Sequence, residues 1–218
     1  MAESARGQAM SLTVLIAMYN SCENVAETLE KLAEQKANHS LEVIVINDGS
    51  GEDASEVENI CNKYNFIYKY QRNAGEATTR DNGLKMATGD YVTWVDADDS
   101  ITDDYLDVIF SEIEDGAYDF ITHPWKYTDG TAGCRHEPPL VNWNVWSNVY
   151  RTSKVQDVPF DKDMRIASDT DWLKRAITSD MVWLDSDKII NIYNAENPDS
   201  LTNQFARGEI KVRFSDDR

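Results

Sequence analysis

Basic residues are scarce in this chain. Its 218 residues include 21 Lys and Arg against 39 Asp and Glu, which gives a formal charge of −18 at pH 7 and a pI near 4.4. The basic residues are interleaved with acidic ones and form no tract. Because nucleic acids and anionic membrane surfaces attract positive charge, this balance argues against general nucleic-acid binding and against binding to such membranes.

Cysteine and long apolar runs are also scarce. The three cysteines, Cys22, Cys61 and Cys134, show no Cys-x-x-Cys spacing, which favours free thiols in a reducing compartment over a disulfide framework or a zinc site. The longest apolar stretch near the start, residues 12–18, is too short to cross a bilayer, and no cleavage site of small residues follows it. We therefore expect neither a transmembrane segment nor a signal peptide, and a cytoplasmic location.

The sequence does contain a regular alternation of apolar and amphipathic segments. We expect strands at 12–18, 41–46, 66–70 and 91–95, and helices at 23–35, 53–64, 77–87 and 102–114. This order predicts parallel βαβ units, and hence an α/β fold with a mostly parallel central sheet flanked by helices. We expect a disordered arm over residues 1–10 and a single domain over 11–218.

Three carboxylates follow the fourth predicted strand. Asp96 and Asp98 are two residues apart in extended chain, so their side chains point the same way and can bind one ligand. Carboxylate oxygens suit Mg²⁺ or Mn²⁺, which bind one or two carboxylates and leave positions for phosphates. The pattern therefore indicates a site for a divalent metal and a nucleotide diphosphate. The alternative is that Asp99 or Ser100 merely caps the helix at 102–114.

A second pattern concerns the segment Gly-Ser-Gly-Glu-Asp-Ala at 49–54, which satisfies the letters of the dinucleotide fingerprint. It follows the second strand instead of the first, and Asp48 would place negative charge beside a pyrophosphate. We therefore favour a tight turn with a helix cap at Ser50 or Asp53 over a NAD site.

Five segments in order, spread over most of the chain, resemble the family-2 glycosyltransferases of the GT-A fold. They read LTVLIAMYN at 12–20, EVIVINDGS at 42–50, NAGEATTRDNGL at 73–84, GDYVTWVDADD at 89–99 and SDTDW at 168–172. The resemblance implies a nucleotide-sugar-binding half over 11–120 and an acceptor-side half over 121–218.

The resemblance also implies roles for single residues in donor binding. Ala17 and Tyr19 match positions lining the nucleoside pocket, and Asp48 matches the acid that bonds a uracil-type ring. Arg80 matches the arginine that closes over the nucleotide. Asp96 and Asp98 match the Asp-x-Asp motif. In that motif the first acid faces the ribose or a metal-bound water, and the second holds Mn²⁺ or Mg²⁺ on the diphosphate.

Asp169 matches the carboxylate that removes a proton from the acceptor hydroxyl, so the resemblance implies that it is the catalytic base. Asp171 is expected to orient the helix or the acceptor and to pair with Arg175 at i+4. The alternative is a charged helix start with Ser168 as N-cap.

The chain also departs from the family pattern. Ser168 replaces the common Glu, Ala17 the usual Pro or Thr, and Asn47 the first acid of Asp-Asp-Gly-Ser. Asn194 stands where an arginine often follows the final tyrosine, so the phosphate contact that the resemblance implies for that arginine is in doubt here.

Together these features predict an inverting, metal-dependent glycosyltransferase that moves a sugar from a UDP-sugar to a hydroxyl of a glycan or other acceptor. Two alternatives stay open. One is a sugar-nucleotide nucleotidyltransferase, although the chain lacks a Gly- and Arg-rich loop after the first strand. The other is a sugar-nucleotide or glycan-binding protein that has lost turnover. The charge disfavours a third, a glycosyltransferase acting on modified DNA bases.

Overall fold

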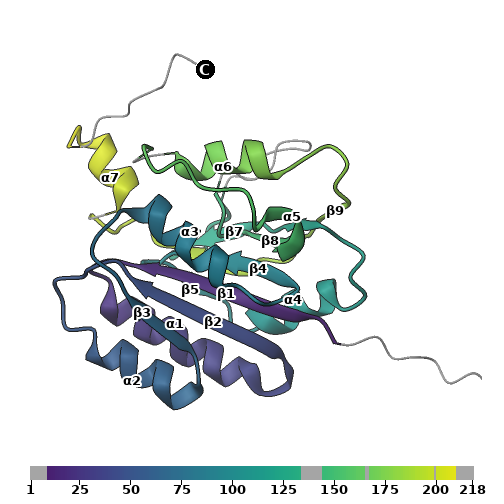
Figure 1. Ribbon diagram of the computed structural model, residues 1–218, viewed down its shortest axis with the longest axis horizontal. Coiled ribbons are helices and arrows are strands. Elements are labelled where there is room, and N and C mark those ends of the chain that lie inside the picture. Colours follow the sequence, from purple (N-terminus) through teal and green to yellow (C-terminus); the bar gives the residue numbers. More distant parts are fainter. Residues whose placement is uncertain (1–8, 134–143, 165–166, 199, 210–218) are drawn as a thin grey trace, which may run out of the picture.

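The computed structural model describes residues 9–133, 144–164, 167–198 and 200–209 (Figure 1). Its elements alternate along the first half of the chain, as the sequence predicts. In order they are β1 (Ser11–Met18), α1 (Cys22–Gln35), a 3₁₀ turn η1 (Lys36–Asn38), β2 (Ser40–Asn47), α2 (Ser55–Tyr64), β3 (Ile67–Tyr70), α3 (Glu76–Met86) and β4 (Tyr91–Trp94). The seven strands and helices expected between residues 12 and 95 are all present, with bounds that shift by no more than two residues.

The second half has shorter elements. They are β5 (Ser100–Ile101), α4 (Tyr105–Ile113), β6 (Phe120–Thr122), β7 (Trp125–Tyr127), β8 (Asn148–Arg151), α5 (Thr152–Val155), α6 (Ser168–Ala176), β9 (Trp183–Asp185), β10 (Asn191–Tyr193) and α7 (Leu201–Ala206). The expected helix at 102–114 is present as α4, but it is shorter, because it begins only at Tyr105 and ends at Ile113.

The central sheet has seven strands in the order β3-β2-β1-β4-β8-β6-β9. The first four strands of that order are parallel, and β8 is antiparallel to both of its neighbours. The sheet is thus mostly parallel, as predicted. A smaller sheet, in the order β5-β10-β7, lies beside it. Strand β5 follows β4 directly in the chain, and β10 pairs with β5. The small sheet therefore borders the carboxyl end of β4.

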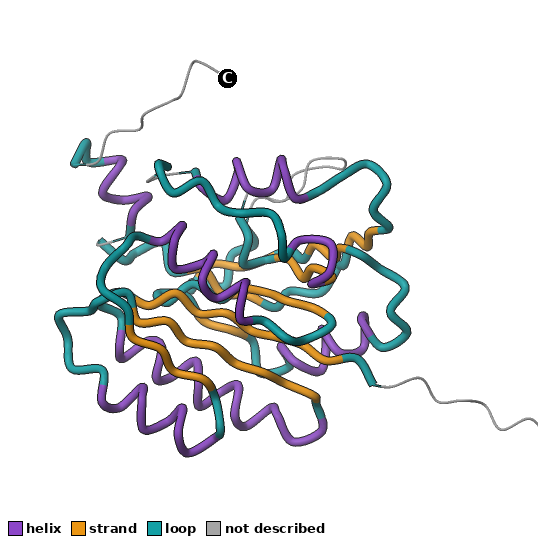
Figure 2. The backbone as a smooth tube through the Cα atoms, viewed as in Figure 1, coloured by secondary structure: helices purple, strands orange, loops and turns teal. Residues whose placement is uncertain are grey.

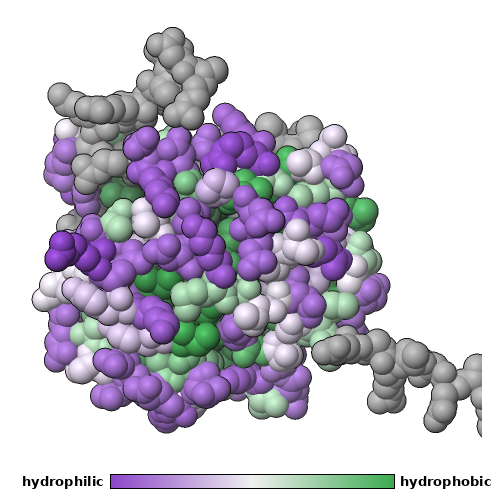
Figure 3. All heavy atoms as spheres, viewed as in Figure 1, coloured by the Kyte–Doolittle hydropathy of each residue, from purple (hydrophilic) through white to green (hydrophobic). Residues whose placement is uncertain are grey.

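Helices cover both faces of the large sheet (Figures 1 and 2). On β1 the residues alternate: Leu12, Val14, Ile16 and Met18 belong to the apolar cluster under α1, α2 and α4, whereas Leu15 belongs to the cluster under α3 and α6. A strand buried on both faces favours apolar residues on both sides, which explains the run at 12–18, where the one polar residue, Thr13, donates its hydroxyl to Glu42 Oε2. Outside the core, the face in Figure 3 is mostly hydrophilic, in keeping with the high charge.

An aromatic cluster attaches α6 to the sheet. The Trp94 ring of β4 makes edge contacts with Tyr150, Phe160 and Trp172, with centroids 5.3 to 5.9 Å apart. Trp172, on α6, also stacks on Phe160 and donates its indole N–H to the carbonyl of Val158 at 2.8 Å. Because these rings are buried and packed on one another, they fix the position of α6 and of the residues at its start.

The remaining expectations of the sequence concern cysteines, the membrane and the terminal arm. Cys22 and Cys61 are free and buried, and burial raises the pKa of the Cys61 thiol to about 12; Cys134 lies outside the described residues. Within the described ranges, no helix is both long and apolar enough to traverse a bilayer. Most of the expected arm, residues 1–8, is outside the described part, and Met10 packs against the core.

Candidate active site

Polar side chains follow three neighbouring strands at one edge of the large sheet. Tyr19 follows β1, Asp48 follows β2 and Asp96 follows β4 shortly after its end. This edge is the carboxyl end of the parallel strands, and β1 there has β2 on one side and β4 on the other. In α/β sheets such a point of reversed strand order is where ligands bind.

The turn after β2 is held to the loop after β1. The backbone N–H of Asn20 donates to Ser50 Oγ at 3.0 Å, and the N–H of Gly51 donates to Asn20 Oδ1 at 2.8 Å. Helix α2 begins only at Ser55, where Asp53 Oδ1 accepts the backbone N–H at 2.9 Å. The glycines therefore form a tight turn that joins two loops, which supports our preference for a turn over a dinucleotide-binding loop. Ser50 does not cap the helix.

Arg80 connects three segments of the chain. Its side chain, on α3, is 2% exposed. Its Nη2 donates to Asp96 Oδ1 at 2.7 Å and lies 2.9 Å from Glu76 Oε1, while its Nη1 donates to Asp169 Oδ1. The guanidinium thus brings together the carboxylates at the end of β4, at the start of α3 and at the start of α6.

The charges in this cluster do not cancel, because one guanidinium faces three carboxyl groups. Burial raises the pKa of Asp169, against the lowering effect of Arg80. Burial likewise raises the pKa of Glu76 to about 7, with Arg80 opposing the shift and Asp169 and Asp96 adding to it. Burial alone would lower the pKa of Arg80, but the surrounding carboxylates outweigh it and keep the guanidinium charged. A carboxylate with a raised pKa is a stronger base near neutral pH.

Asp169 occupies the first turn of α6, yet its carboxylate is directed at other parts of the chain. Oδ1 accepts from Arg80, and Oδ2 accepts the backbone N–H of Val145 at 3.1 Å. Helix α6 starts at Ser168 itself, Ala167 is the residue before it, and no side chain caps this end. The alternative in which Ser168 is the N-cap is therefore wrong. The role of Asp169 as a base stays a prediction that this position favours.

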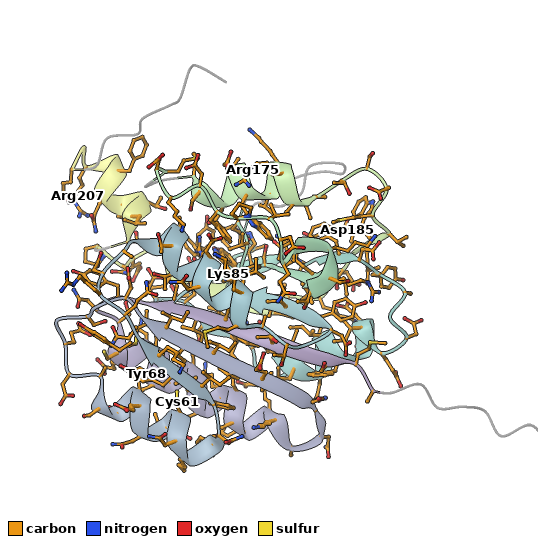
Figure 4. The ribbon with its side chains drawn as sticks, in the orientation of Figure 1. Cys61, Tyr68, Lys85, Arg175, Asp185 and Arg207 are labelled. Atoms are coloured by element: carbon orange, nitrogen blue, oxygen red, sulfur yellow. The ribbon has the colours of Figure 1, made fainter. Side chains whose placement is uncertain are left out.

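The expected pair of Asp171 and Arg175 is confirmed. Arg175 Nε and Nη2 donate to Asp171 Oδ2 at 3.0 and 2.6 Å. Arg175 lies on α6 in Figure 4, and its Nη1 also donates to the carbonyl of Pro159 at 2.6 Å. Asp171 therefore forms a partly exposed ion pair on the helix and is not one of the carboxylates that contact Arg80.

The carboxylates after β4 have different surroundings. Asp98 Oδ2 accepts Asn197 Nδ2 at 2.7 Å, and Asp99 Oδ1 accepts the backbone N–H of Asn194 at 2.8 Å. Helix α4 begins at Tyr105, so the alternative in which Asp99 or Ser100 caps this helix is wrong. Instead, Asp99 anchors the segment after β10. Burial, and then the neighbouring Asp96, raise the pKa of Asp98.

This donor set fits a divalent ion that shares its coordination with a ligand. Among the described residues, no three His, Cys, Asp or Glu side chains form a group that could hold a metal alone. Asp96 and Asp98 are two hard oxygen donors, and Mg²⁺ or Mn²⁺ binds through one or two carboxylates together with water and phosphate. A cation there would also offset the repulsion between Asp96 and Asp98, which adds to the effect of burial on the pKa of Asp98.

The residues expected to bind a nucleoside lie in β1 and in the segments that follow β1 and β2. Ala17 is half-buried in β1, and Tyr19 is 52% exposed, so its ring face is accessible. Asp48 is buried and accepts three hydrogen bonds. Gln71 Nε2 and the N–H of Ala74 donate to Oδ1 at 2.7 and 2.8 Å, and the N–H of Gly75 donates to Oδ2 at 2.9 Å.

Gly49 allows the loop that binds Asp48 to approach. Its φ is +76°, and a Cβ atom at this position would lie 2.7 Å from the backbone N of Asn73. We expect Gly49→Ala to destabilise the protein by about 1–3 kcal/mol, through strained backbone and displacement of the loop. Denaturant unfolding measures this. Gly130→Ala is the control, because Gly130 has φ +86° and no atom within 4 Å of its Cβ position. Equal losses from the two changes would contradict the steric part of this prediction.

Three residues of the site were missed by sequence reasoning. Glu76 lies inside the quoted motif and is four residues from Arg80, a spacing that signals a helical ion pair. Gln71 and Asn197 contact Asp48 and Asp98, but they lie 23 and 99 residues away in sequence. No local pattern indicates contacts of that range.

The mostly parallel sheet and the carboxylates at its edge define an α/β protein with an acidic site at the carboxyl ends of its parallel strands. Residues 13–180 match the family model described as Glycosyl transferase family 2. The chain therefore belongs to glycosyl transferase family 2.

Curated relatives agree with this family. The chain is 38% identical over 105 residues to the cholesterol galactosyltransferase of Borreliella burgdorferi, an alignment that covers 46% of this chain and 28% of that protein. It is 26% identical over 159 residues to glycosyltransferase GlyA of Streptococcus pneumoniae, covering 66% of this chain and 22% of GlyA. The chain thus spans only about a quarter of the length of these two relatives.

Solved structures agree with the fold. The chain superposes on S. aureus TarS 1–349 in complex with UDP-GlcNAc with a TM-score of 0.73 and 26% identity, covering 86% of this chain and 59% of that one. It superposes on the mannosyltransferase PcManGT of Pyrobaculum calidifontis, in complex with GDP-Man and Mn²⁺, with a TM-score of 0.66 and 15% identity. That match covers 95% of this chain and 67% of PcManGT. The GT-A fold expected from the resemblance is confirmed.

Proposed function

We propose that this chain transfers a sugar from a UDP-sugar to a hydroxyl of a glycan or other acceptor, with inversion at the anomeric carbon. One observation carries the proposal: Arg80 holds Asp169 and Asp96 in a single cluster although they lie on different segments. An inverting transfer needs a base on the acceptor side and a diphosphate site on the donor side, close enough to act on one sugar. Asp169 and Asp96 are the groups that would serve these two sides.

The reaction is a single displacement. The Asp169 carboxylate accepts the proton of the acceptor hydroxyl, whose oxygen forms a bond to the anomeric carbon while the bond from that carbon to the diphosphate oxygen breaks. The products are the glycosylated acceptor, UDP and a protonated Asp169, which returns its proton to water. The raised pKa of Asp169 suits a group that must accept a proton near neutral pH.

Asp96 and Asp98 are the residues that would hold Mn²⁺ or Mg²⁺. When bound, such an ion neutralises charge that develops on the leaving diphosphate. The solved structure with Mn²⁺ named above shares only the fold with this chain, so the support for a metal here comes from the two carboxylates after β4.

Tyr19 and Asp48 would hold the nucleoside. Tyr19 offers an accessible ring for stacking on the base, and Asp48 offers a carboxylate oxygen to a ring N–H. The TarS structures in complex with UDP and with UDP-GlcNAc support a uridine nucleotide as the donor for a chain of this fold.

A thermal-shift screen tests the donor and the metal together. We expect a UDP-sugar with Mn²⁺ to raise the melting temperature most among UDP-, GDP-, CMP- and dTDP-sugars, because a ligand that binds only the native state stabilises it in proportion to its affinity. Omitting Mn²⁺ should remove most of the shift. Stabilisation by none of these donors would overturn the proposal, and a CMP-sugar giving the largest shift would overturn the choice of uridine.

A further inference from the structure

Glu76 is the third carboxylate on Arg80, and it has no task in the proposed reaction. It is the first residue of α3, its side chain is 35% exposed, and its Oε1 lies 2.9 Å from Arg80 Nη2. The same Nη2 already donates to Asp96, and Nη1 donates to Asp169. Among the described residues, Arg80 is the one cationic group in contact with Glu76. Glu76 therefore adds a negative charge that the guanidinium does not balance.

The excess of negative charge would remain with a donor and a metal ion in place. The cluster has four carboxylates that act on one another electrostatically, those of Glu76, Asp96, Asp98 and Asp169. A bound diphosphate adds further negative charge. On the positive side, the described part of the chain brings only Arg80 into contact with these carboxylates, and a divalent ion would join it. The sugar of a donor would therefore lie in a region of net negative charge.

This excess sets a condition on the sugar of the donor. In the proposed reaction the anomeric carbon lies between Asp169 and the diphosphate, so the ring that carries it lies beside the cluster. A neutral sugar is not repelled there, whereas a uronic acid carries a carboxylate at C6. Two like unit charges about 8 Å apart, at an effective dielectric constant of about 20, weaken binding by roughly thirtyfold.

We propose that Glu76 is a specificity-determining residue that excludes donors with an anionic sugar, so that the donor is a UDP-sugar whose sugar is neutral. The inference rests on the proposed function, because it assumes that the donor sugar lies beside Arg80 and its carboxylates. It goes beyond that function by naming the class of donor sugar and a residue that selects it.

Calorimetric titration with UDP-glucose and UDP-glucuronate, in the presence of Mn²⁺ at pH 8, tests the inference. Burial raises the pKa of Glu76 to about 7, so pH 8 keeps this side chain ionised. The two ligands differ only at C6, where the first has a hydroxymethyl group and the second a carboxylate. The quantity to compare is the ratio of their dissociation constants.

We expect wild type to bind UDP-glucose at least about thirtyfold more tightly than UDP-glucuronate, and Glu76→Gln to lower this ratio by about ten- to thirtyfold. Glu76→Asp should keep most of the wild-type ratio, because it keeps the charge although its shorter side chain alters the contact with Arg80. A purely structural role of that contact would leave the ratio unchanged in Glu76→Gln, or would change it equally in both variants.

Glu56→Gln is the matched control. Glu56 is exposed in the first turn of α2, on the opposite face of the large sheet from α3 (Figure 1), so this change also removes a negative charge from the start of a helix. Its ratio should equal that of wild type.

Three results would overturn this inference alone. They are equal or tighter binding of UDP-glucuronate by wild type, a wild-type ratio in Glu76→Gln, and failure of Glu76→Gln to fold beside a folded Glu56→Gln. Failure of wild type to bind UDP and both UDP-sugars would overturn the proposed function as well.

Discussion

We expect Asp169→Asn to lower kcat by roughly two to four orders of magnitude, the contribution typical of a positioned general base. The affinity for UDP should change little, because deprotonation of the acceptor takes place in the transition state and not when the nucleotide binds. The asparagine has nearly the same shape and keeps one oxygen that can accept from Arg80 or from the Val145 N–H. Steady-state kinetics with an acceptor and donor taken from screening, together with UDP titration, measure both quantities.

Asp171→Asn is the control for this experiment. Asp171 lies on the same helix two residues further on, but its carboxylate is paired with Arg175 and is 35% exposed. We expect it to keep near-normal kcat. If Asp171→Asn proved the more damaging change, or if Asp169→Asn kept near-normal turnover, Asp169 would not be the base and its bond to Arg80 would be structural only.

The parallel part of the sheet was predictable because three of its four strands, β1, β2 and β4, are largely buried. Burial on both faces requires a continuous apolar run such as 12–18, and between such runs α1 and α2 show the spacing of a helix with one buried side. The turn residues at the strand ends are equally local signals. These elements need no knowledge of the rest of the chain, and so sequence reasoning finds them.

The second half was less predictable, because its strands are two to four residues long and too short to show a period. Strand β8 pairs with β4 across more than fifty residues, and β5 is only two residues long and depends on β10 for its hydrogen bonds. Such pairing is decided by tertiary contacts.

The arrangement of the site also depends on tertiary contacts. The sequence identifies Asp48, Asp96, Asp98 and Asp169 by their motifs, but the partners that orient them lie far away along the chain.

Arg80 illustrates the difference between identifying a residue and placing it. Its motif predicts contact with the nucleotide, and that role stays a prediction. In the structure both terminal nitrogens are bonded to carboxylates, and the side chain is 2% exposed. Arg80 therefore has a second task that no motif states, which is to hold Asp96 and Asp169 together.

The second large effect is expected at Asp98. We expect Asp98→Asn to weaken UDP binding in the presence of Mn²⁺ by at least about a hundredfold, because changes to residues that merely support metal ligands already cost ten- to hundredfold. Binding by the variant should no longer respond to Mn²⁺ or to a chelator. Calorimetry with UDP, with and without Mn²⁺, measures the effect.

The fold should survive this change. An asparagine oxygen can still accept from Asn197 Nδ2, and the variant removes a negative charge whose burial is unfavourable, as the raised pKa of Asp98 shows. When a carboxyl group has a higher pKa in the folded than in the unfolded state, the folded protein loses stability as the pH rises above the pKa of the unfolded state. At neutral pH the variant should therefore melt no lower than wild type.

Asp103→Asn is the matched control for Asp98→Asn, because Asp103 is an exposed acid five residues further along the same segment. It should keep wild-type affinity and the response to Mn²⁺. Equal UDP affinity in wild type and Asp98→Asn, with and without chelator, would exclude Asp98 as a metal ligand. A large drop in melting temperature would instead show that Asp98 serves the fold through Asn197. Loss of Mn²⁺-dependent binding at an unchanged or higher melting temperature is the result that separates a metal ligand from a structural acid.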